Sequence, residues 1–439
     1  MSSTRLIIDF HVHSRFARAC SKTLTLPNMA AWAAVKGIDV LGTADFTHPV
    51  WLKEIQAQLV EAGQGVYTLK AKHGVSLPYD VVAPRPVRFL LTHEVATIWS
   101  QGGKLRRMHT VLVAPDMRAA EALTEQLTPR GKLGADGRPI LGMSARELAV
   151  IAWGVDERYL VIPAHAWTPW FAVFGSQSGF DSLEECFGDL TPRILAVETG
   201  LSSDPTMNWQ LSALDSVALI STSDAHSPDN LGREATVFQT EDELSFDLVA
   251  AMLRAGAPAR SAERSTWNYL DYTIEFFPEE GKYHNDGHRT CGVSWTPEER
   301  KRHNGLCTSC GKPVTVGVLS RIDDLADRPH GFVPDGAPGY RNIVPIRDIA
   351  SSTLGVGKKA KAVDKLYEQL VTKVGPEFDV LLDAELEAIR RASSDEFAEI
   401  VGAMRQGQVS VRPGYDGVYG ELLLPDRNRS RQANLFQQS

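Results

Sequence analysis

Cysteine is scarce in this sequence, which has five cysteines among 439 residues. That is too few for the disulfide framework of a secreted chain, so we expect free or metal-bound thiols. Long apolar runs are also missing, since no stretch approaches the ~20 residues of a membrane-spanning helix. The N-terminal segment has one basic residue and a very short apolar run, which does not match a secretory signal. We therefore expect a cytoplasmic protein with no membrane partner.

Positive charge is not in excess either, because the formal net charge is -8. This argues against a protein that coats nucleic acid nonspecifically. A local basic groove remains compatible with it, since electrostatic steering depends on where the charges lie. The P-loop sequence that cradles nucleotide phosphates is absent, so work driven by nucleotide hydrolysis is not expected.

Residues 1–240 alternate short apolar runs with helical segments. Strand followed by helix, repeated, predicts a parallel α/β architecture, open or closed into a barrel. In such folds the carboxyl ends of the strands hold the functional residues. The predicted strands lie in RLIIDF, GIDVLGTADF, VRFLLTHEVATIW, MHTVLVAP, YLVIPAHAW, ILAVETG and VALISTSDAH.

The pattern changes after residue 240. We interpret residues 241–280 as a connection. Residues 281–345 are rich in Cys, His, Gly and Pro with little periodicity, and such a segment usually needs a metal to fold. Residues 346–425 are predicted to form helices followed by two strands. Residues 426–439 are predicted to be a flexible polar tail.

His11 and His13 lie two residues apart, so on a strand both imidazoles face one side and can hold one ion. A lone pair of this kind is more often two surface histidines. Here, however, histidines and acidic residues recur at nearly every predicted strand end. Mixed imidazole and carboxylate ligands suit Zn, Mn or Fe, including clusters of several ions. The recurring residues are Asp45, His48, Glu94, His109, His165, Glu198, Asp224 and His226. Asp9, on the strand face of the two histidines, is a candidate for orienting one of them.

These segments resemble a known family. DFHVHS, TADFTH, PAHAW and SDAHS, with the segments around Glu94 and His109, occur in the order of the polymerase-and-histidinol-phosphatase (PHP) family of metal-dependent phosphoesterases. The resemblance implies a distorted seven-stranded α/β barrel with a trinuclear site. It implies that the first ion is held by the predicted catalytic residues His11, His13, Glu94 and Asp224, the second by Glu94, His109 and His165, and the third by a set that includes His226.

The sequence departs from the family at the third ion. The family commonly has Asp-His where this chain has Asp45-Phe46, and a histidine often found shortly after His-x-His is absent. Asp45 and His48 are the candidates for the third ion, whereas Cys20 is interpreted as a buried thiol. We expect zinc in the cluster, with Mg or Mn as alternatives for catalysis. A bound ion lowers the pKa of its water toward about 7 and so supplies hydroxide.

A second metal site is predicted between residues 284 and 310. The spacing H-x2-C-x15-C-x2-C is a strong signal for structural zinc, because three thiolates and one imidazole close the shell. The predicted ligands are His288, Cys291, Cys307 and Cys310. His284 is a rival for the histidine position, and His303 a weaker one. The basic run ERKRH leaves two interpretations open, a contact with nucleic acid or a plain folding element.

The segments GKYHNDGHRTCGV, CTSCGKPVTVGVLSRIDDLADRP and RPGYDGVYGE extend the resemblance to nearly the whole chain. It is similar there to the endonuclease Q family of DNA-repair nucleases. This implies cleavage 5′ to deaminated bases (uracil, hypoxanthine, xanthine) and to abasic sites, in DNA whose damaged nucleotide is flipped out. Alternatives are a small-molecule phosphatase, which predicts a nearly bare barrel, and a non-catalytic DNA- or clamp-binding protein, which predicts gaps in the ligand set.

Candidate DNA-binding residues fall into three groups, each with an alternative. The aromatic residues after PAHA either stack on DNA or form core, and the tyrosines of PGYDGVYG either approach a ligand or flank a tight turn. The lysines of LGVGKKAKAV resemble the hairpin of helix-hairpin-helix modules or start a solvated helix. The candidates are Trp167, Trp170, Phe171, Phe174, Tyr415, Tyr419, Lys358 and Lys359.

The tail contains QANLF, in which Gln432, Leu435 and Phe436 resemble the peptide that docks bacterial repair proteins onto the sliding clamp. A tether of this kind would raise the local concentration of the enzyme on DNA. A chance match of five residues is the alternative. With DNA as partner, we expect the protein to associate with the nucleoid.

Overall fold

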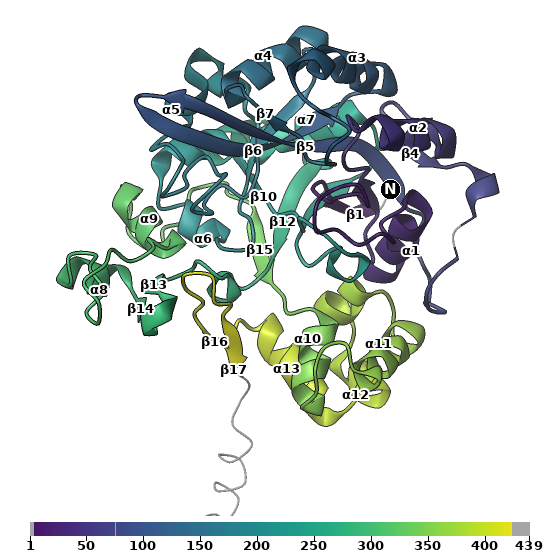
Figure 1. Ribbon diagram of the computed structural model, residues 1–439. Helices are drawn as coiled ribbons and strands as arrows, with labels where there is room; N and C mark the ends of the chain where they lie inside the picture. The colour runs from purple at the N-terminus through teal and green to yellow at the C-terminus, as the bar shows by residue number, and fades with distance from the viewer. Residues whose placement is uncertain (1–3, 75, 424–439) are drawn as a thin grey trace, which may run out of the picture.

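The computed structural model describes residues 4–74 and 76–423. A mixed α/β unit is followed by a small Cys-rich segment and a group of helices (Figure 1). The strands are β1 (Thr4–Asp9), β2 (Val40–Gly42), β3 (Leu59–Gly63), β4 (Val66–Leu69), β5 (Arg88–Gln101), β6 (Lys104–Ala114), β7 (Ile140–Leu141), β8 (Leu160–Pro163), β9 (Ala196–Glu198), β10 (Ala218–Ile220), β11 (Ala235–Thr240), β12 (Tyr269–Glu275), β13 (Asp286–His288), β14 (Val293–Trp295), β15 (Gly339–Asn342), β16 (Ser410–Arg412) and β17 (Glu421–Leu423). The helices are α1 (Leu26–Lys36), α2 (Pro49–Gln58), α3 (Met117–Leu127), α4 (Ala145–Val155), α5 (Leu183–Phe187), α6 (Pro205–Asn208), α7 (Phe246–Gly256), α8 (Pro297–Arg302), α9 (Val318–Leu325), α10 (Ile346–Leu354), α11 (Lys361–Lys373), α12 (Leu386–Ala392) and α13 (Asp395–Arg405).

The main sheet is mixed, so the predicted parallel sheet is wrong in part. β1, β2 and β5 are parallel neighbours, but β11 is antiparallel to β1, and β6 is antiparallel to both β5 and β8. β5 and β6 are antiparallel because a tight turn joins them directly. Gly102 and Gly103 have φ values of 60° and 74°, the left-handed conformation of a two-residue hairpin turn. Glu94 and His109 therefore lie within long hairpin strands rather than at strand ends.

The predicted closed barrel of seven strands is not confirmed. An 11-stranded sheet contains β1, β11 and β5 to β8, whereas β9 and β10 pair with each other in a separate two-stranded sheet. The described strands thus form no continuous hydrogen-bonded ring. The mixed α/β class and the helical C-terminal region are confirmed.

The predicted domain boundary at residue 240 does not coincide with the sheet. β12, inside the expected connection, pairs with β11, and β15, inside the expected Cys-rich segment, pairs in parallel with β12. Neither strand was predicted from the sequence. β12 (YLDYTIE) has polar residues at alternate positions instead of an apolar run, and β15 (GYRN) has no apolar run at all. The Cys-rich segment also contains a two-stranded sheet of its own, β13–β14.

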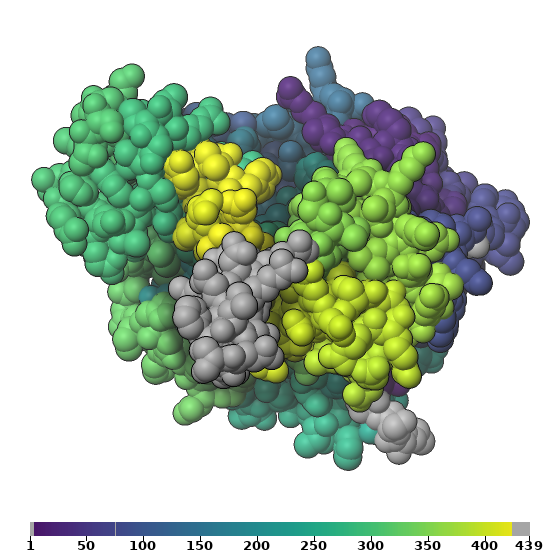
Figure 2. All heavy atoms as spheres, turned by 90° about the horizontal axis from the view of Figure 1, so that it is seen from below, coloured from purple at the N-terminus to yellow at the C-terminus, as the bar shows by residue number. Residues whose placement is uncertain are grey.

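The C-terminal helical region, α10 to α13, has its own buried residues and is fastened to the α/β unit. Tyr367 and Phe397 are fully buried inside it. The buried Glu377 accepts a hydrogen bond from the Tyr367 hydroxyl at 2.8 Å and pairs with the Lys36 ammonium of α1 at 2.5 Å. Seen from below, the β16–β17 hairpin lies between the Cys-rich segment and these helices (Figure 2). Gln432, Leu435 and Phe436 lie outside the described residues.

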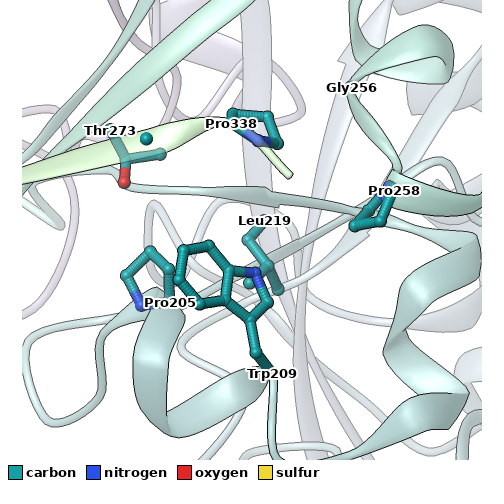
Figure 3. Close-up of a pocket in the computed structure, with 8 residues that line it drawn as sticks. Pro205, Trp209, Leu219, Gly256, Pro258, Thr273 and Pro338 are labelled. Atoms are coloured by element: carbon teal, nitrogen blue, oxygen red, sulfur yellow. The ribbon is translucent and has the colours of Figure 1, made fainter. Parts of the chain in front are cut away.

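A small hollow lies where β12 and β15 meet α6. The ring of Trp209 lies beside Pro205 and Leu219 there, with Pro258 and Pro338 on the other side (Figure 3). Apart from Thr273 the lining residues are apolar, and none belongs to the predicted site, so we interpret the hollow as packing. Within the described ranges, no helix combines the length and apolar character needed to cross a bilayer.

Candidate metal centre and adjoining cavity

The segment after β1 runs beside the segment after β10. Val12 bridges to Ala225, and the His13 N–H donates to the Ala225 carbonyl at 3.1 Å. The buried Asp9 carboxylate accepts the Ser223 N–H at 3.0 Å and the Gly232 N–H at 3.3 Å. Asp9 thus fixes the backbone next to Asp224, rather than orienting a histidine as we predicted.

His11, His13, Glu94 and Asp224 form one ligand group. One donor atom from each lies within 4.8 Å of the others. The His13 Nε2 lies 3.1 Å from Asp224 Oδ1 and 3.2 Å from Glu94 Oε2. The His11 Nε2 lies 3.5 Å from the same Glu94 oxygen. Both imidazoles and Glu94 are buried.

Glu94, His109 and His165 form a second group through the other Glu94 oxygen. Glu94 Oε1 lies 2.7 Å from His109 Nδ1 and 3.4 Å from His165 Nε2. In the β5–β6 register, Glu94 faces Val111 and His109 faces Ala96, so the two ligands are diagonal neighbours across the hairpin. Glu94 is therefore placed to bridge two ions.

Three of the predicted ligands have strained backbones. Asp45, His165 and Asp224 have φ values of 43°, 30° and 46°, in the left-handed region. A non-glycine residue held there costs of order 1–3 kcal/mol, and such residues cluster at active sites. Each follows a short strand, β2, β8 or β10, and turns its side chain toward the centre.

The donor set fits a cation. His11 Nε2, His13 Nδ1 and Asp45 Oδ1 are buried and have no hydrogen-bond partner among the described residues. A buried polar atom left in this way costs about 1–3 kcal/mol, which coordination would relieve. Burial alone would lower the pKa of His11, but Glu198 and Glu94 outweigh it and raise that pKa well above its usual range. The carboxylates thus attract positive charge to the centre.

Two residues of the centre were missed or given no role from the sequence. Glu198 has both carboxylate oxygens 3.1 Å from His11 Nδ1 and accepts the His165 backbone N–H at 2.9 Å, so it supports a ligand of each group. The position of Glu198 at the end of a predicted strand was the sequence signal for a role at the centre. Arg138 donates from Nη1 to Glu94 Oε2 at 3.0 Å, and no motif surrounds it.

The predicted third ligand set is not assembled. Asp45 Oδ2 accepts the Ser14 N–H at 2.8 Å and the Ser14 hydroxyl at 2.6 Å. His48 caps α2, accepting the Trp51 N–H at 3.4 Å, and its ring stacks on a neighbouring phenylalanine. His226 Nδ1 bonds to the Asp224 carbonyl oxygen at 2.8 Å. Among the described residues, these three side chains therefore form no common ligand group. Burial raises the pKa of Cys20 to about 11, as expected of a neutral thiol.

A cavity of about 830 Å³ adjoins the centre. His109, His165 and Asp224 line one side. The rest of the lining includes basic and aromatic side chains from four segments: Trp170 and Phe171 after β8, Lys282 and Tyr283 before β13, Lys358 in the α10–α11 hairpin, and Tyr419 in the β16–β17 hairpin.

The other predicted DNA-binding residues do not line this cavity. Trp167 and Phe174 are buried and pack with ring centroids 4.7 Å apart, and the Trp167 indole donates to the Asn208 side chain at 2.7 Å. They are core residues, so the stacking prediction is wrong for both. Tyr415 is half-buried against Gly287, and Lys359 is exposed beside the cavity-lining Lys358.

The Cys-rich segment assembles the predicted closed site. One donor atom each from His288, Cys291, Cys307 and Cys310 lies within 4.8 Å of the others. Burial opposes ionisation of Cys307, but the backbone N–H groups of Ser309 and Cys310 prevail and lower the pKa of the thiol to about 6. Only Val293, Trp295, Cys307 and Val314 form the local apolar core, which is too small to fold unaided. The rivals His284 and His303 are outside this group.

The chain is similar to proteins from archaea and bacteria. Residues 345–408 match the model of the MJ0043 C-terminal domain. The uncharacterized protein YqxK of Bacillus subtilis is 27% identical over 434 residues, which cover 95% of this chain and 99% of that protein. The uncharacterized protein MJ0043 of Methanocaldococcus jannaschii is 29% identical over 274 residues, 61% of this chain, and the match spans 33% of that protein's length.

Among solved structures, the lesion-specific endonuclease PfuEndoQ of Pyrococcus furiosus matches with a TM-score of 0.81 and 28% identity, over 96% of both chains. This chain has the endonuclease Q fold. An endonuclease Q complex with a 27-mer duplex, which has an abasic lesion at the active site, gives a TM-score of 0.81 and 29% identity over 96% of this chain and 97% of the other. The resemblance to endonuclease Q predicted from the sequence is confirmed.

Proposed function

We propose that this protein is a metal-dependent endonuclease that cleaves DNA at damaged nucleotides. The observation that supports this best is the pairing of a carboxylate–imidazole centre with an adjoining cavity of about 830 Å³. The endonuclease Q fold, which covers 96% of the chain, favours the same function. The finer proposal is cleavage 5′ to uracil, hypoxanthine, xanthine or an abasic site.

The ions proposed for this centre are Zn, Mg or Mn, held by His11, His13, Glu94 and Asp224 and by Glu94, His109 and His165. When bound, they supply hydroxide at neutral pH and neutralise phosphate oxygens. A water oxygen adds to phosphorus, the P–O3′ bond breaks, and a proton goes to the leaving O3′. The products are a 3′-hydroxyl and a 5′-phosphate. The second proposed site, in the Cys-rich segment, holds structural zinc.

The cavity suits a flipped nucleotide. A deaminated base differs from its parent at the Watson–Crick edge, which a protein can contact only after the nucleotide leaves the stack. Trp170 is 37% exposed and Tyr419 is 71% exposed, so both rings present surface on which a base can stack. Trp170 also packs edge-on against Tyr283, and the Lys282 ammonium lies over the Tyr419 ring. Lys282 and Lys358 are exposed cations at the same cavity, where Lys358 pairs with Asp348, and both are suited to backbone phosphates.

The clamp contact by Gln432, Leu435 and Phe436 stays a proposal, because these residues are outside the described ranges. It is separable from catalysis. Deleting residues 432–436 should weaken pulldown by a bacterial sliding clamp and leave nicking of short duplexes unchanged. Retained pulldown would contradict this role of the tail.

A nicking assay tests the main proposal. Purified protein is incubated with Mg²⁺ or Mn²⁺ and end-labelled duplexes containing uracil, hypoxanthine, an abasic site or no lesion, and in parallel with a phosphomonoester. We expect a nick 5′ to the lesion that Asp224→Asn abolishes while DNA binding is retained. Asp189→Asn, at an exposed position remote from the cavity, is the matched control. Phosphate release from the monoester without nicking would favour the phosphatase alternative and refute the proposal.

A further inference from the structure

Arg138 is held beside the metal centre by packing on both sides of its loop. On one side, Pro139 accepts the Ala96 N–H at 3.0 Å, and β7 continues this pairing along β5, two residues from Glu94. On the other side, Gly137 lies so close to Asp45 that an added Cβ would be 2.2 Å from the Asp45 Oδ2. The loop is therefore positioned by the strand that contains Glu94, the carboxylate shared by both ligand groups.

The Arg138 guanidinium has capacity to bind a ligand. Among the described residues, the guanidinium makes one hydrogen bond, from Nη1 to Glu94 Oε2 at 3.0 Å. A guanidinium has five N–H donors, so the others can bind a ligand. The side chain is 27% exposed and lines the cavity together with Asp224 and His226. Arg233 lines the same cavity but differs, because it donates to the Ser223 and Asp224 carbonyl oxygens and so holds backbone.

The Arg138 side chain is a permanent cation. A guanidinium stays protonated at every pH at which proteins are folded. The predicted third ligand set, Asp45, His48 and His226, is not assembled in this part of the centre. A fixed positive charge is thus present without a further ion.

We propose that Arg138 is a catalytic residue that binds a non-bridging oxygen of the scissile phosphodiester and stabilises the charge that grows there in the transition state. The inference rests on the proposed phosphodiesterase function. A planar guanidinium matches two phosphate oxygens, which an ammonium cannot do. Its bond to Glu94 aligns it with the carboxylate shared by both ligand groups.

Three variants test the proposal: Arg138→Ala, Arg138→Lys and, as control, Arg130→Ala. Arg130 lies on the same connecting stretch and pairs with Glu147 at the surface, 2.9 Å away. Hydrolysis is followed on lesion duplexes and on bis(4-nitrophenyl) phosphate, a diester that needs no lesion recognition. Bound metal is measured by mass spectrometry, DNA affinity by anisotropy and folding by thermal melting.

We expect Arg138→Ala to lower kcat on both substrates by about 10²–10³-fold, the usual loss on removing one transition-state donor. Arg138→Lys should fall between, Arg130→Ala should match the wild type, and added guanidinium should restore part of the Arg138→Ala rate. Metal content should be unchanged, with one ion for each of the three ligand groups. An Arg138→Ala rate within threefold of wild type, or metal loss in proportion to activity, would overturn the inference. If the wild type cleaves the model diester but no lesion duplex, the lesion specificity fails while the Arg138 comparison stands; if it cleaves neither, both fail.

Discussion

Glu198 offers a sharp test of how the metal centre is built, because it contacts a ligand of each group without being a ligand itself. Both of its oxygens lie 3.1 Å from His11 Nδ1, and Oε2 also accepts the His165 N–H at 2.9 Å. We predict that Glu198→Gln weakens binding of the cluster ions while the protein stays folded. The substitution keeps the shape of the side chain and removes its charge.

The size of the effect follows from the hydrogen bonds that a glutamine side chain can form at this position. If the glutamine oxygen accepts the His165 N–H, its amide group faces His11 Nδ1 and donates to it. The neutral His11 ring must then hold its own proton on Nε2, the atom that faces Glu94 and Asp224. If the amide is flipped, its N–H₂ meets the His165 N–H instead. Loss of such a supporting carboxylate costs 10–100-fold in metal affinity, about 1.4–2.8 kcal/mol.

The measurement is Mn²⁺ affinity of metal-stripped protein in which the Cys-rich site has been refilled with zinc. Calorimetry should give a Kd for Glu198→Gln that is 10–100-fold above that of the wild type. Glu243→Gln, at an exposed position, is the matched control and should not differ. A Glu198→Gln Kd within twofold of wild type would refute the view that Glu198 sets the His11 tautomer.

Three further predictions concern folding, stability and DNA binding. Cys310→Ser should remove one equivalent of bound zinc and make the Cys-rich segment sensitive to proteolysis, whereas His303→Gln should do neither; equal zinc content in both variants would count against the site. Burial raises the pKa of Glu275 to about 8 from its ordinary value of 4.5. Between these pH values the folded state keeps a proton that the unfolded state has lost, so the stability of the wild type should fall as the pH rises from about 4.5 to about 8. Glu275→Gln should accordingly melt higher than wild type at pH 8 and similarly at pH 4.5; equal melting at pH 8 would contradict this. Trp170→Ala should weaken DNA binding with unchanged melting, whereas Trp167→Ala, at a fully buried position, should cost about 3–5 kcal/mol of folding stability in denaturant titrations; the reverse pattern would mean that the two indoles are misassigned.

The ligand types and spacings of this chain are predictable from sequence because chemistry limits them. His11-x-His13 and the Cys307-x2-Cys310 knuckle place donors together by local geometry alone, and the structure brings each pair into a ligand group. Glu94 and His109 were singled out for a reason that the fold does not support. They lie inside antiparallel strands, and the hairpin register brings them together, not a shared sheet edge.

Residues whose role depends on tertiary neighbours were beyond sequence reasoning. Arg138 follows a glycine in a loop with no motif, and only the pairing of β7 with β5 brings it to Glu94. Trp167 and Trp170 belong to one short aromatic run, yet one is core and the other is 37% exposed. Their difference is set by what packs on each, and Trp167 is fixed by Asn208, which lies 41 positions further along the chain.

The continuation of the main sheet past residue 240 has a functional consequence. β12 pairs with β11, the neighbour of β1, so the strand that leads to Lys282 and Tyr283 belongs to the same sheet as the strand that leads to His11 and His13. β15 pairs with β12 and leads to α10, whose hairpin contains Lys358. The basic and aromatic walls of the cavity are therefore tied to the metal centre by hydrogen-bonded strands rather than by a free linker. In the proposed nuclease, the sheet would therefore set the distance between the DNA-binding wall of the cavity and the ligand groups. We infer that lengthening the segment between β15 and α10 should impair cleavage more than binding, because Lys358 would then no longer be held at a fixed distance from Glu94.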